Sequence, residues 1–271
     1  LAMVVTDHHH MHEAPPMDIC IINPNRPDYD VQEKYLAGAA VAFMFVMALR
    51  KKLREEGLMK SGEPHLGRMI NLAALGIIAD IAPLVGTNRI LAKFGLKGLS
   101  NAHQAGLKEL VRACGIDSKV QETYVSFRLA PRINAAGRMG EVYTALELLM
   151  TDDEAKAVEL ASRLSSLNSL RQRTEEGLLE QAMEAAVSQK DEGAIVVSGE
   201  GWHSGVIGIV ASRLANRFER PSVVISCDDD ICRGSIRGIE GSNVIEALKA
   251  VSEHLEAFGG HTQAAGLSIR R

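Results

Sequence analysis

The sequence predicts an α/β protein in three parts: a partial domain with a parallel sheet, a long connector helix, and a smaller α/β domain with a mixed sheet. Short β-rich runs near the N-terminus end abruptly in polar residues, a pattern typical of buried parallel strands. A long apolar stripe without proline follows residue 150, and a strand–turn–helix–strand pattern follows residue 193. We therefore expect domains at 1–150 and 191–271, joined by a connector at 151–190.

The first expected strand ends in side chains that can hold a metal ion. Asp7, His8 and His9 follow the first apolar run directly. Ligands of open α/β sheets bind at the carboxyl ends of the strands. A carboxylate and an imidazole suit Mn²⁺, Mg²⁺ or Zn²⁺. The alternative is a histidine-rich surface turn, because His10 and His12 follow.

The second expected strand, Ile19–Ile22, ends at a proline-rich segment, Asn23-Pro24-Asn25-Arg26-Pro27. Proline lacks an N–H donor and disfavours helix at the residue before it. Apolar periodicity then predicts helices at residues 37–56, 68–79, 88–98 and 102–114. Asp80 follows the second of these helices and is expected to point into the same crevice as Asp7. The alternative is that Asp80 caps the next turn.

An arginine-rich segment, residues 128–140, is expected to form a loop. It contains Arg128, Arg132 and Arg138, and Glu141 is the only acid nearby. Guanidinium groups bind phosphate through two parallel hydrogen bonds. The alternative is that these arginines pair with carboxylates on neighbouring helices.

A long helix is expected from Thr151, where Thr151-Asp152-Asp153-Glu154 has the pattern of a capping box. Apolar residues then recur with a spacing that predicts one buried stripe: Ala155, Val158, Ala161, Leu164, Leu167, Leu170, Leu178, Ala182 and Ala186. At 1.5 Å per residue such a helix would be ~55 Å long. We interpret it as a rigid connector whose stripe is core.

The C-terminal part begins with an expected strand at 194–198, a glycine-rich turn at 199–205, a helix at 206–218 and a strand at 221–226. This order predicts a βαβ unit. Backbone N–H groups at the start of that helix are suited to an anion. The alternative is that the glycines only allow tight turns.

Two later motifs are candidates for phosphate binding. Strands are expected around residues 233–238, where Ser235 and Arg237 would share one face. A helix at 243–256 precedes Gly259, Gly260 and His261, and a strand follows at 266–269. Two adjacent glycines allow a ligand to approach the backbone closely. Exposed serine and arginine are also common on edge strands.

Composition limits the function classes. The chain has a formal charge of −4 and 4% aromatic residues, so we expect neither a broad basic surface nor extensive base stacking. The four cysteines form no C-x-x-C pair, which favours a reducing cytoplasm. The longest apolar run is shorter than the ~20 residues that span a bilayer.

The order of these motifs resembles one superfamily. Three segments resemble the later half of a DHH phosphoesterase domain: Thr6-Asp7-His8-His9, Ile22-Asn23-Pro24-Asn25 and Ala79-Asp80-Ile81-Ala82-Pro83-Leu84. Two more resemble the end of that domain and its connecting helix: residues 133–139 and 167–172. Two others resemble the associated DHHA1 domain: residues 199–208 and 258–261. The chain is most similar to the single-strand-specific exonucleases of this superfamily.

The resemblance implies a function and a set of site residues. The function is 5′-to-3′ hydrolysis of single-stranded DNA in repair and recombination, with Mn²⁺ or Mg²⁺ as cofactor. Single-stranded DNA is the implied partner, a single-strand-binding protein or a helicase is a candidate protein partner, and no membrane is involved. The implied metal ligands are Asp7, His8 and Asp80, and the implied catalytic residues are His8 and His9. The implied phosphate-binding residues are Arg138, Ser235, Arg237, Gly259, Gly260 and His261.

The sequence also departs from the superfamily pattern. Two acidic motifs that precede the DHH signature and an OB-fold region that follows the glycine-rich motif are not in it. We therefore expect a fragment with an incomplete two-metal site. Two alternatives stay open: a phosphodiesterase for short oligonucleotides, nucleoside bisphosphates or cyclic dinucleotides, and a non-catalytic single-strand-binding scaffold.

Overall fold

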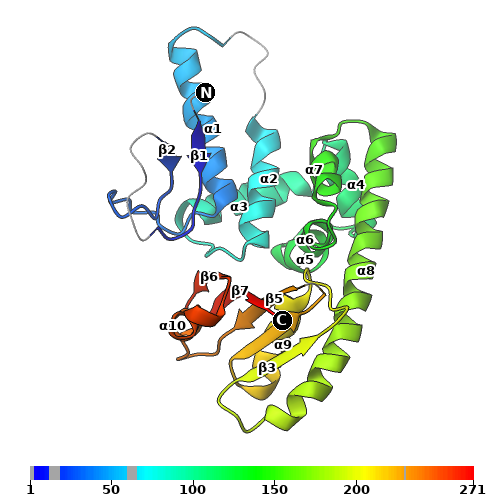
Figure 1. Ribbon diagram of the computed structural model, residues 1–271. Helices are drawn as coiled ribbons and strands as arrows, with labels where there is room; N and C mark the ends of the chain where they lie inside the picture. The colour runs from blue at the N-terminus through cyan, green and yellow to red at the C-terminus, as the bar shows by residue number, and fades with distance from the viewer. Residues whose placement is uncertain (1–2, 12–18, 60–65, 229) are drawn as a thin grey trace. The chain divides into compact units, whose positions relative to one another are not determined.

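The computed structural model describes residues 3–11, 19–59, 66–228 and 230–271. The chain forms two compact units, which are coloured along the chain in Figure 1. One unit comprises Leu1–Asn134 and Tyr143–Ser165, and the other comprises Ala135–Val142 and Ser166–Arg271. The sequence-based boundaries at residues 150 and 190 stay a prediction.

The first unit contains a small parallel sheet. Strands β1 (Val4–Thr6) and β2 (Cys20–Ile22) pair in parallel, with Thr6 opposite Ile22. This confirms two parallel strands whose carboxyl ends share one edge. The predicted burial is wrong, since Val4 and Thr6 of β1 and Cys20 of β2 are exposed. The helices that follow are α1 (Gly38–Glu55), α2 (Leu66–Ala79), α3 (Gly86–Leu99), α4 (Ala105–Ala113), α5 (Glu122–Tyr124) and α7 (Val142–Met150). The four predicted helices are confirmed, with ends shifted by at most three residues.

Small residues bring the first three helices close together. A Cβ on Gly76 of α2 would lie 2.4 Å from the Cβ of Ala39 in α1. A Cβ on Gly95 of α3 would lie 2.4 Å from the carbonyl oxygen of Ile70 in α2. Neither position can accept a side chain without a backbone shift, because interiors are packed as densely as organic crystals. This packing fixes the C-terminal end of α2, where Asp80 lies.

The prediction of a loop at residues 128–140 is wrong. Residues Val125–Leu129 form a π-helical turn, and Ala130–Arg138 form α6. Pro131 lies inside a continuous helical run, Glu122–Arg138, directly after the π-helical turn, where the α-helical hydrogen-bond pattern is already interrupted. The π turn therefore accommodates the proline within the helix, and Pro131 does not mark a loop.

The long helix is confirmed as α8, Glu154–Ala186, with a 3₁₀ turn after it at Val187–Gln189. Its buried stripe differs from the predicted one. Val158 and Leu170 are 50% and 42% exposed, whereas Ala157 is fully buried. A three-residue step advances 300° around a helix of 3.6 residues per turn, so a stripe predicted by that spacing drifts off the buried face.

The second unit is a mixed sheet with helices. Its elements are β3 (Ile195–Gly199), α9 (Ile207–Phe218), β4 (Ser222–Ser226), β5 (Ile231–Arg237), α10 (Val244–Ala250), a 3₁₀ turn (Ser252–His254), β6 (Ala257–His261) and β7 (Ala264–Arg270). The strand order is β3-β4-β5-β7-β6, and only β3 and β4 pair in parallel. The predicted βαβ unit and mixed sheet are confirmed. The predicted helix at 243–256 is too long, since α10 ends at Ala250.

Apolar residues cover both faces of this sheet. On one face, α9 and the C-terminal part of α8 pack against β3 and β4 through Leu178, Ala182, Ile195, Leu214 and Val224. On the other face, α10 packs through Val244 and Leu248 against Ile236 and Ala265. Because strand residues alternate between faces, Ser235 lies on the same face as its cross-strand partner Val224.

Candidate functional site

A cavity of about 960 Å³ lies in the second unit. Its floor is the row Ser235–Gly266–Gly259, three residues that oppose one another across β5, β7 and β6. A Cβ on Gly259 would meet no heavy atom within 4 Å. The two glycines therefore leave bare backbone where other residues would fill the space.

The next row on the same face contains two more predicted residues. Arg237 of β5 and His261 of β6 both oppose Ala264 of β7. Ser235 and Gly259 line the cavity, and Arg237 and His261 lie two residues further along their strands. The Nε atom of Arg237 is buried and has no hydrogen-bond partner in the described part of the chain.

Gly260 lies between these two rows and faces the opposite side of the sheet. Its φ is +151°, and a Cβ there would lie 2.3 Å from the carbonyl oxygen of Ala264. Only glycine fits this position. The role predicted for Gly260 as a phosphate-binding residue stays a prediction, and its contacts give it a structural one.

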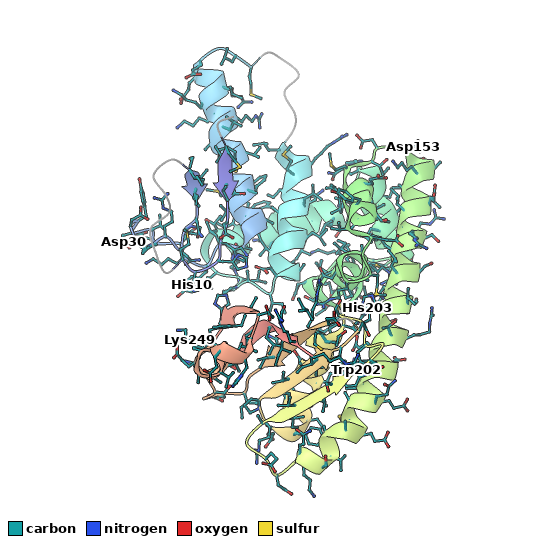
Figure 2. All side chains as sticks on the ribbon, in the orientation of Figure 1. His10, Asp30, Asp153, Trp202, His203 and Lys249 are labelled. Atoms are coloured by element: carbon teal, nitrogen blue, oxygen red, sulfur yellow. The ribbon has the colours of Figure 1, made fainter. Side chains whose placement is uncertain are left out.

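Arg138 and His203 form part of the cavity wall. The Nη1 atom of Arg138 donates a hydrogen bond to the carbonyl oxygen of Gly205 at 3.0 Å. Burial lowers the pKa of Arg138, as does nearby Arg171, while Glu175 opposes the change. The guanidinium still carries its charge, because arginine does not deprotonate in proteins. Figure 2 labels His203, whose Nδ1 accepts a hydrogen bond from the backbone N–H of Gly205 at 3.0 Å.

The other two arginines of the same segment bind protein acceptors. Nη1 of Arg128 lies 3.4 Å from the carbonyl oxygen of Gly115. Arg132 donates to the carbonyl oxygen of Arg128 at 2.8 Å and to the hydroxyl of Ser165 at 3.2 Å. Of the three, Arg138 is the one that lines the cavity.

The glycine-rich turn before α9 holds this wall in place. Trp202, labelled in Figure 2, is 5% exposed and lies on Gly199, where a Cβ would come within 2.3 Å of its ring. Its indole N–H donates to Oε1 of Gln181 in α8 at 3.0 Å. A Cβ on Gly208, in the first turn of α9, would lie 3.0 Å from the hydroxyl of Ser235. The start of α9 therefore approaches the cavity floor closely.

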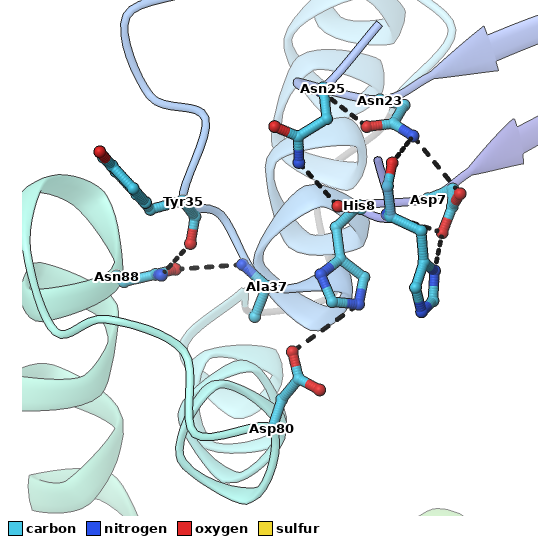
Figure 3. Close-up of polar contacts among 9 residues, drawn as sticks. Asp7, His8, Asn23, Asn25, Tyr35, Ala37, Asp80 and Asn88 are labelled. Carbon is cyan, nitrogen blue, oxygen red and sulfur yellow. Dashed lines mark hydrogen bonds and ion pairs between the residues drawn. The ribbon is translucent and has the colours of Figure 1, made fainter. Parts of the chain in front are cut away.

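The first unit brings His8 and Asp80 together, as Figure 3 shows. Nε2 of His8, just beyond β1, lies 3.7 Å from Oδ2 of Asp80, just beyond α2. Asp80 was expected near Asp7, and in the structure its carboxylate lies beside His8. Asp7 is engaged elsewhere: its Oδ1 lies 2.8 Å from Nδ1 of His9. Burial acts to raise the pKa of Asp7, but hydrogen bonds from the His9 ring and from the backbone of His8 and His9 outweigh it and lower that pKa.

Asn23 and Asn25 support the Asp7–His9 segment, and sequence reasoning did not count them among the site residues. The Nδ2 of Asn23 donates to the carbonyl oxygen of His9 at 2.9 Å, and that of Asn25 donates to the carbonyl oxygen of His8 at 2.7 Å. Asn23 also reaches the carboxylate of Asp7 at 3.4 Å. Their position at the end of β2 could have predicted this role, because the carboxyl ends of parallel strands lie at the same edge of a sheet.

Backbone strain accompanies Asp80. The next residue, Ile81, has φ +55° and is 87% exposed. A β-branched residue in the left-handed region is a true outlier. Asn88 holds the adjoining segments: its Nδ2 donates to the carbonyl oxygen of Tyr35 at 2.6 Å, as Figure 3 shows. The same amide nitrogen donates to the carbonyl oxygen of Pro83 at 3.1 Å.

A complete metal site is not visible in the described residues. Within 3–11, 19–59, 66–228 and 230–271, no three histidine, cysteine, aspartate or glutamate side chains are grouped to hold an ion. His10 is exposed and is labelled in Figure 2. His12 lies outside the described residues.

Comparison with known proteins shows what this chain is similar to. Residues 191–271 match the DHHA1 domain family. The whole chain is 39% identical over 274 residues to the single-stranded-DNA-specific exonuclease RecJ of Bacillus subtilis, and 98% of it is 39% identical to RecJ of Thermus thermophilus. It superimposes on the Thermus thermophilus RecJ structure in complex with Mn²⁺ with a TM-score of 0.85, at 38% identity over 98% of the chain. Over nearly its whole length, the chain is similar to RecJ exonucleases.

The chain spans only part of its RecJ relatives. It covers 33% of the Bacillus subtilis protein, 37% of the Thermus thermophilus protein and 38% of the Thermus structure. A second RecJ structure, bound to manganese, is matched over 64% of its length with a TM-score of 0.83. None of the described helices combines the length and apolar character needed to cross a bilayer.

Proposed function

We propose that this chain supplies part of a metal-dependent exonuclease that hydrolyses single-stranded DNA from its 5′ end. The observation that carries the proposal is the cavity of the second unit, where Arg138, Arg233 and Ser235 surround a floor of bare glycine backbone. Guanidinium groups, a hydroxyl and open backbone suit a phosphate oxygen, and the glycines admit the strand close to the sheet. Arg233 is a further cavity residue that sequence reasoning did not single out.

The resident metal would be Mn²⁺ or Mg²⁺, the ions present in the RecJ structures that resemble this chain. The fit is partial. Two ligands bound to one ion at about 2.1 Å each can lie up to about 4.2 Å apart, so the 3.7 Å between His8 and Asp80 suits a shared ion. Asp7 would complete this set from the same segment. When bound, the metal would polarise a phosphate and lower the pKa of bound water.

His9 is proposed to move a proton. A carboxylate accepts hydrogen bonds, so Nδ1 of His9 carries the proton directed at Asp7. Nε2 of the neutral ring is then the free acceptor, and the ring is 67% exposed. This is the arrangement in which an acid orients an imidazole that acts as a base.

A second candidate is a non-catalytic scaffold that binds single strands. The observation that favours it is the lack of a three-residue metal group among the described residues. For location and partners, we propose the cytoplasm, single-stranded DNA, and a single-strand-binding protein or helicase. The four cysteines without a C-x-x-C pair support the cytoplasm, and the proposed substrate supports the choice of partners.

The test uses the purified chain with a 5′-phosphorylated single strand, with and without Mn²⁺. We expect binding that weakens when the 5′ phosphate is removed, and only slow Mn²⁺-dependent loss of nucleotides from the 5′ end, which Asp80→Asn abolishes. Binding without digestion would favour the scaffold. Turnover of dinucleotides, without digestion of long strands, would favour a phosphodiesterase for small substrates. Robust digestion would also contradict the expectation of an incomplete two-metal site.

A further inference from the structure

His203 lies in the glycine-rich turn between β3 and α9, and its side chain lines the cavity of the second unit. The turn fixes the backbone from which the ring extends. The carbonyl oxygen of His203 accepts a hydrogen bond from the backbone N–H of Val206 at 3.0 Å, and Val206 is fully buried. The preceding residue, Trp202, donates from its indole N–H to Gln181 at 3.0 Å. Packed neighbours on both sides therefore set the position of the imidazole.

A backbone N–H determines which ring nitrogen of His203 carries the proton. The N–H of Gly205 donates to Nδ1 at 3.0 Å, and an amide nitrogen can only donate. Nδ1 is therefore bare, and the neutral ring carries its proton on Nε2. Within the described residues Nε2 has no hydrogen-bond partner and is not buried. The Nε2–H group is thus a donor open to a ligand.

Gly205 joins His203 to Arg138. Its N–H bonds the imidazole, and its carbonyl oxygen accepts a hydrogen bond from Nη1 of Arg138 at 3.0 Å. A Cβ on Gly205 would lie 3.0 Å from Cε1 of His203 and 2.1 Å from the carbonyl oxygen of Arg138. Both side chains line the same cavity. One glycine therefore holds an imidazole N–H and a guanidinium on the same cavity wall.

The lining of this cavity suits an anion. None of the described residues that line it is acidic, and Arg138 and Arg233 contribute positive charge. His203 therefore has no carboxylate in the cavity with which to pair. A phosphate oxygen accepts hydrogen bonds, and bonds to a charged acceptor are roughly twice as strong as those between neutral groups. A donor of fixed direction beside a guanidinium is an arrangement that binds such an oxygen.

We propose that His203 is a phosphate-binding residue, which donates from Nε2 as a neutral imidazole to a phosphate that Arg138 also contacts. The inference rests on the proposed function for its natural ligand, a phosphate of the single strand. The alternative is a histidine that only closes the turn through Nδ1. The two roles use different ring nitrogens, so a substitution can separate them.

The substitution His203→Asn keeps the turn and removes the donor. An asparagine side chain accepts a hydrogen bond from the backbone N–H two residues further on, as Nδ1 of His203 does from Gly205. Its amide is too short to reach the position of Nε2. Urea unfolding followed by Trp202 should therefore give a midpoint close to that of the parent chain.

Strand affinity is measured by fluorescence anisotropy with a 5′-phosphorylated oligonucleotide at about pH 8, where imidazoles are mostly neutral. We expect His203→Asn to weaken binding about tenfold, because it loses a hydrogen bond to a charged group. His103→Asn is the control, at an exposed histidine that does not line the cavity, and should leave the affinity unchanged. If folded His203→Asn binds the strand as tightly as the parent chain, this inference fails while the proposed function stands.

A measurement on the parent chain makes the test independent of how the variant folds. A nitrogen-15 NMR spectrum correlates the ring nitrogens of His203 with its ring protons, assigned through their connection to the backbone signals. We expect a protonated Nε2 and a bare Nδ1, and we expect inorganic phosphate to shift Nε2 more than Nδ1. A proton on Nδ1, or a ring that phosphate leaves unchanged, would overturn the proposal. If phosphate shifts Nε2 but the chain binds no single strand, the proposed function fails and the phosphate contact of His203 stands.

Discussion

Arg138 and Gly205 contact each other in two ways. The Nη1 of Arg138 donates to the carbonyl oxygen of Gly205 at 3.0 Å, and a Cβ on Gly205 would lie 2.1 Å from the carbonyl oxygen of Arg138. The end of α6 and the turn before α9 therefore meet backbone to backbone. Glycine at 205 is required by this close approach, and the hydrogen bond directs Arg138 along the cavity wall.

Replacing Gly205 with alanine should damage both stability and strand binding. The new Cβ overlaps a backbone oxygen, which cannot move away as a flexible side chain would. We expect a loss of about 1–3 kcal/mol of unfolding free energy, the usual cost of overpacking. Urea unfolding followed by the single, buried Trp202 measures it. An unchanged unfolding midpoint would show that the two segments can separate without cost.

Gly177→Ala should have the opposite effect and serves as the matched control. Gly177 lies inside α8, and a Cβ there would meet nothing within 4 Å. Alanine is favoured over glycine in a helix interior by about 0.5–1 kcal/mol. The same urea experiment should therefore show a higher midpoint. A lower midpoint would indicate that α8 needs flexibility at this residue.

The cavity floor could be predicted only in part from the sequence. Alternation places Ser235 and Arg237 on one face, and the glycine pair before His261 marks a close approach. Nothing local in the sequence specifies that β7 lies between β5 and β6, so the alignment of these residues in rows depends on long-range pairing. Alternation also places Arg233 on the face of Ser235, but only the pairing of the strands shows that this face lines a cavity.

The arginine segment shows the other limit. Pro131, Asn134 and Gly137 favour a loop by local preference, but the helical run that contains the π turn and α6 includes all three. Packing overrides such preferences when a buried face is available, and Leu129, Ala135 and Ala136 are fully buried here. The end of β1 was easier to predict as a strand end, because a short apolar run that stops at polar residues is typical of a parallel strand.

Ile81→Gly should stabilise the chain despite removing a large side chain. Ile81 has φ +55°, where an L-residue costs about 1–2 kcal/mol, and its exposed side chain contributes little burial. Glycine relieves the strain but loses more entropy on folding, so we expect a net gain of about 0.5–1 kcal/mol. The melting temperature should rise. Ile90→Gly, at an exposed position within α3, should lower it instead.

Cys227 should resist alkylation at neutral pH. Burial and a hydrogen bond with Cys232 raise its pKa to about 11. The thiolate is the nucleophile, and only about 0.1% of the Cys227 thiol would be ionised at pH 8. The alkylation rate should therefore rise about tenfold per pH unit up to about pH 10. Peptide mapping after timed iodoacetamide treatment compares it with exposed Cys20. Equal rates for the two cysteines at pH 8 would contradict this, and Cys232→Ala should speed the reaction of Cys227.

Asp80→Asn tests the metal proposal without any DNA. The amide keeps the shape of the carboxylate but removes the charge that faces His8 at 3.7 Å. Substituting even an outer partner of a metal ligand typically weakens binding about 10–100-fold, so loss of a direct carboxylate ligand should weaken Mn²⁺ binding by at least about tenfold. Calorimetric titration of Mn²⁺ into the parent chain, into Asp80→Asn and into Asp117→Asn provides the measurement. Asp117 is exposed, so its variant is the control. If Asp80→Asn binds Mn²⁺ as tightly as the parent, the contact between His8 and Asp80 is an ordinary ion pair. The metal ligands would then have to include residues other than Asp80.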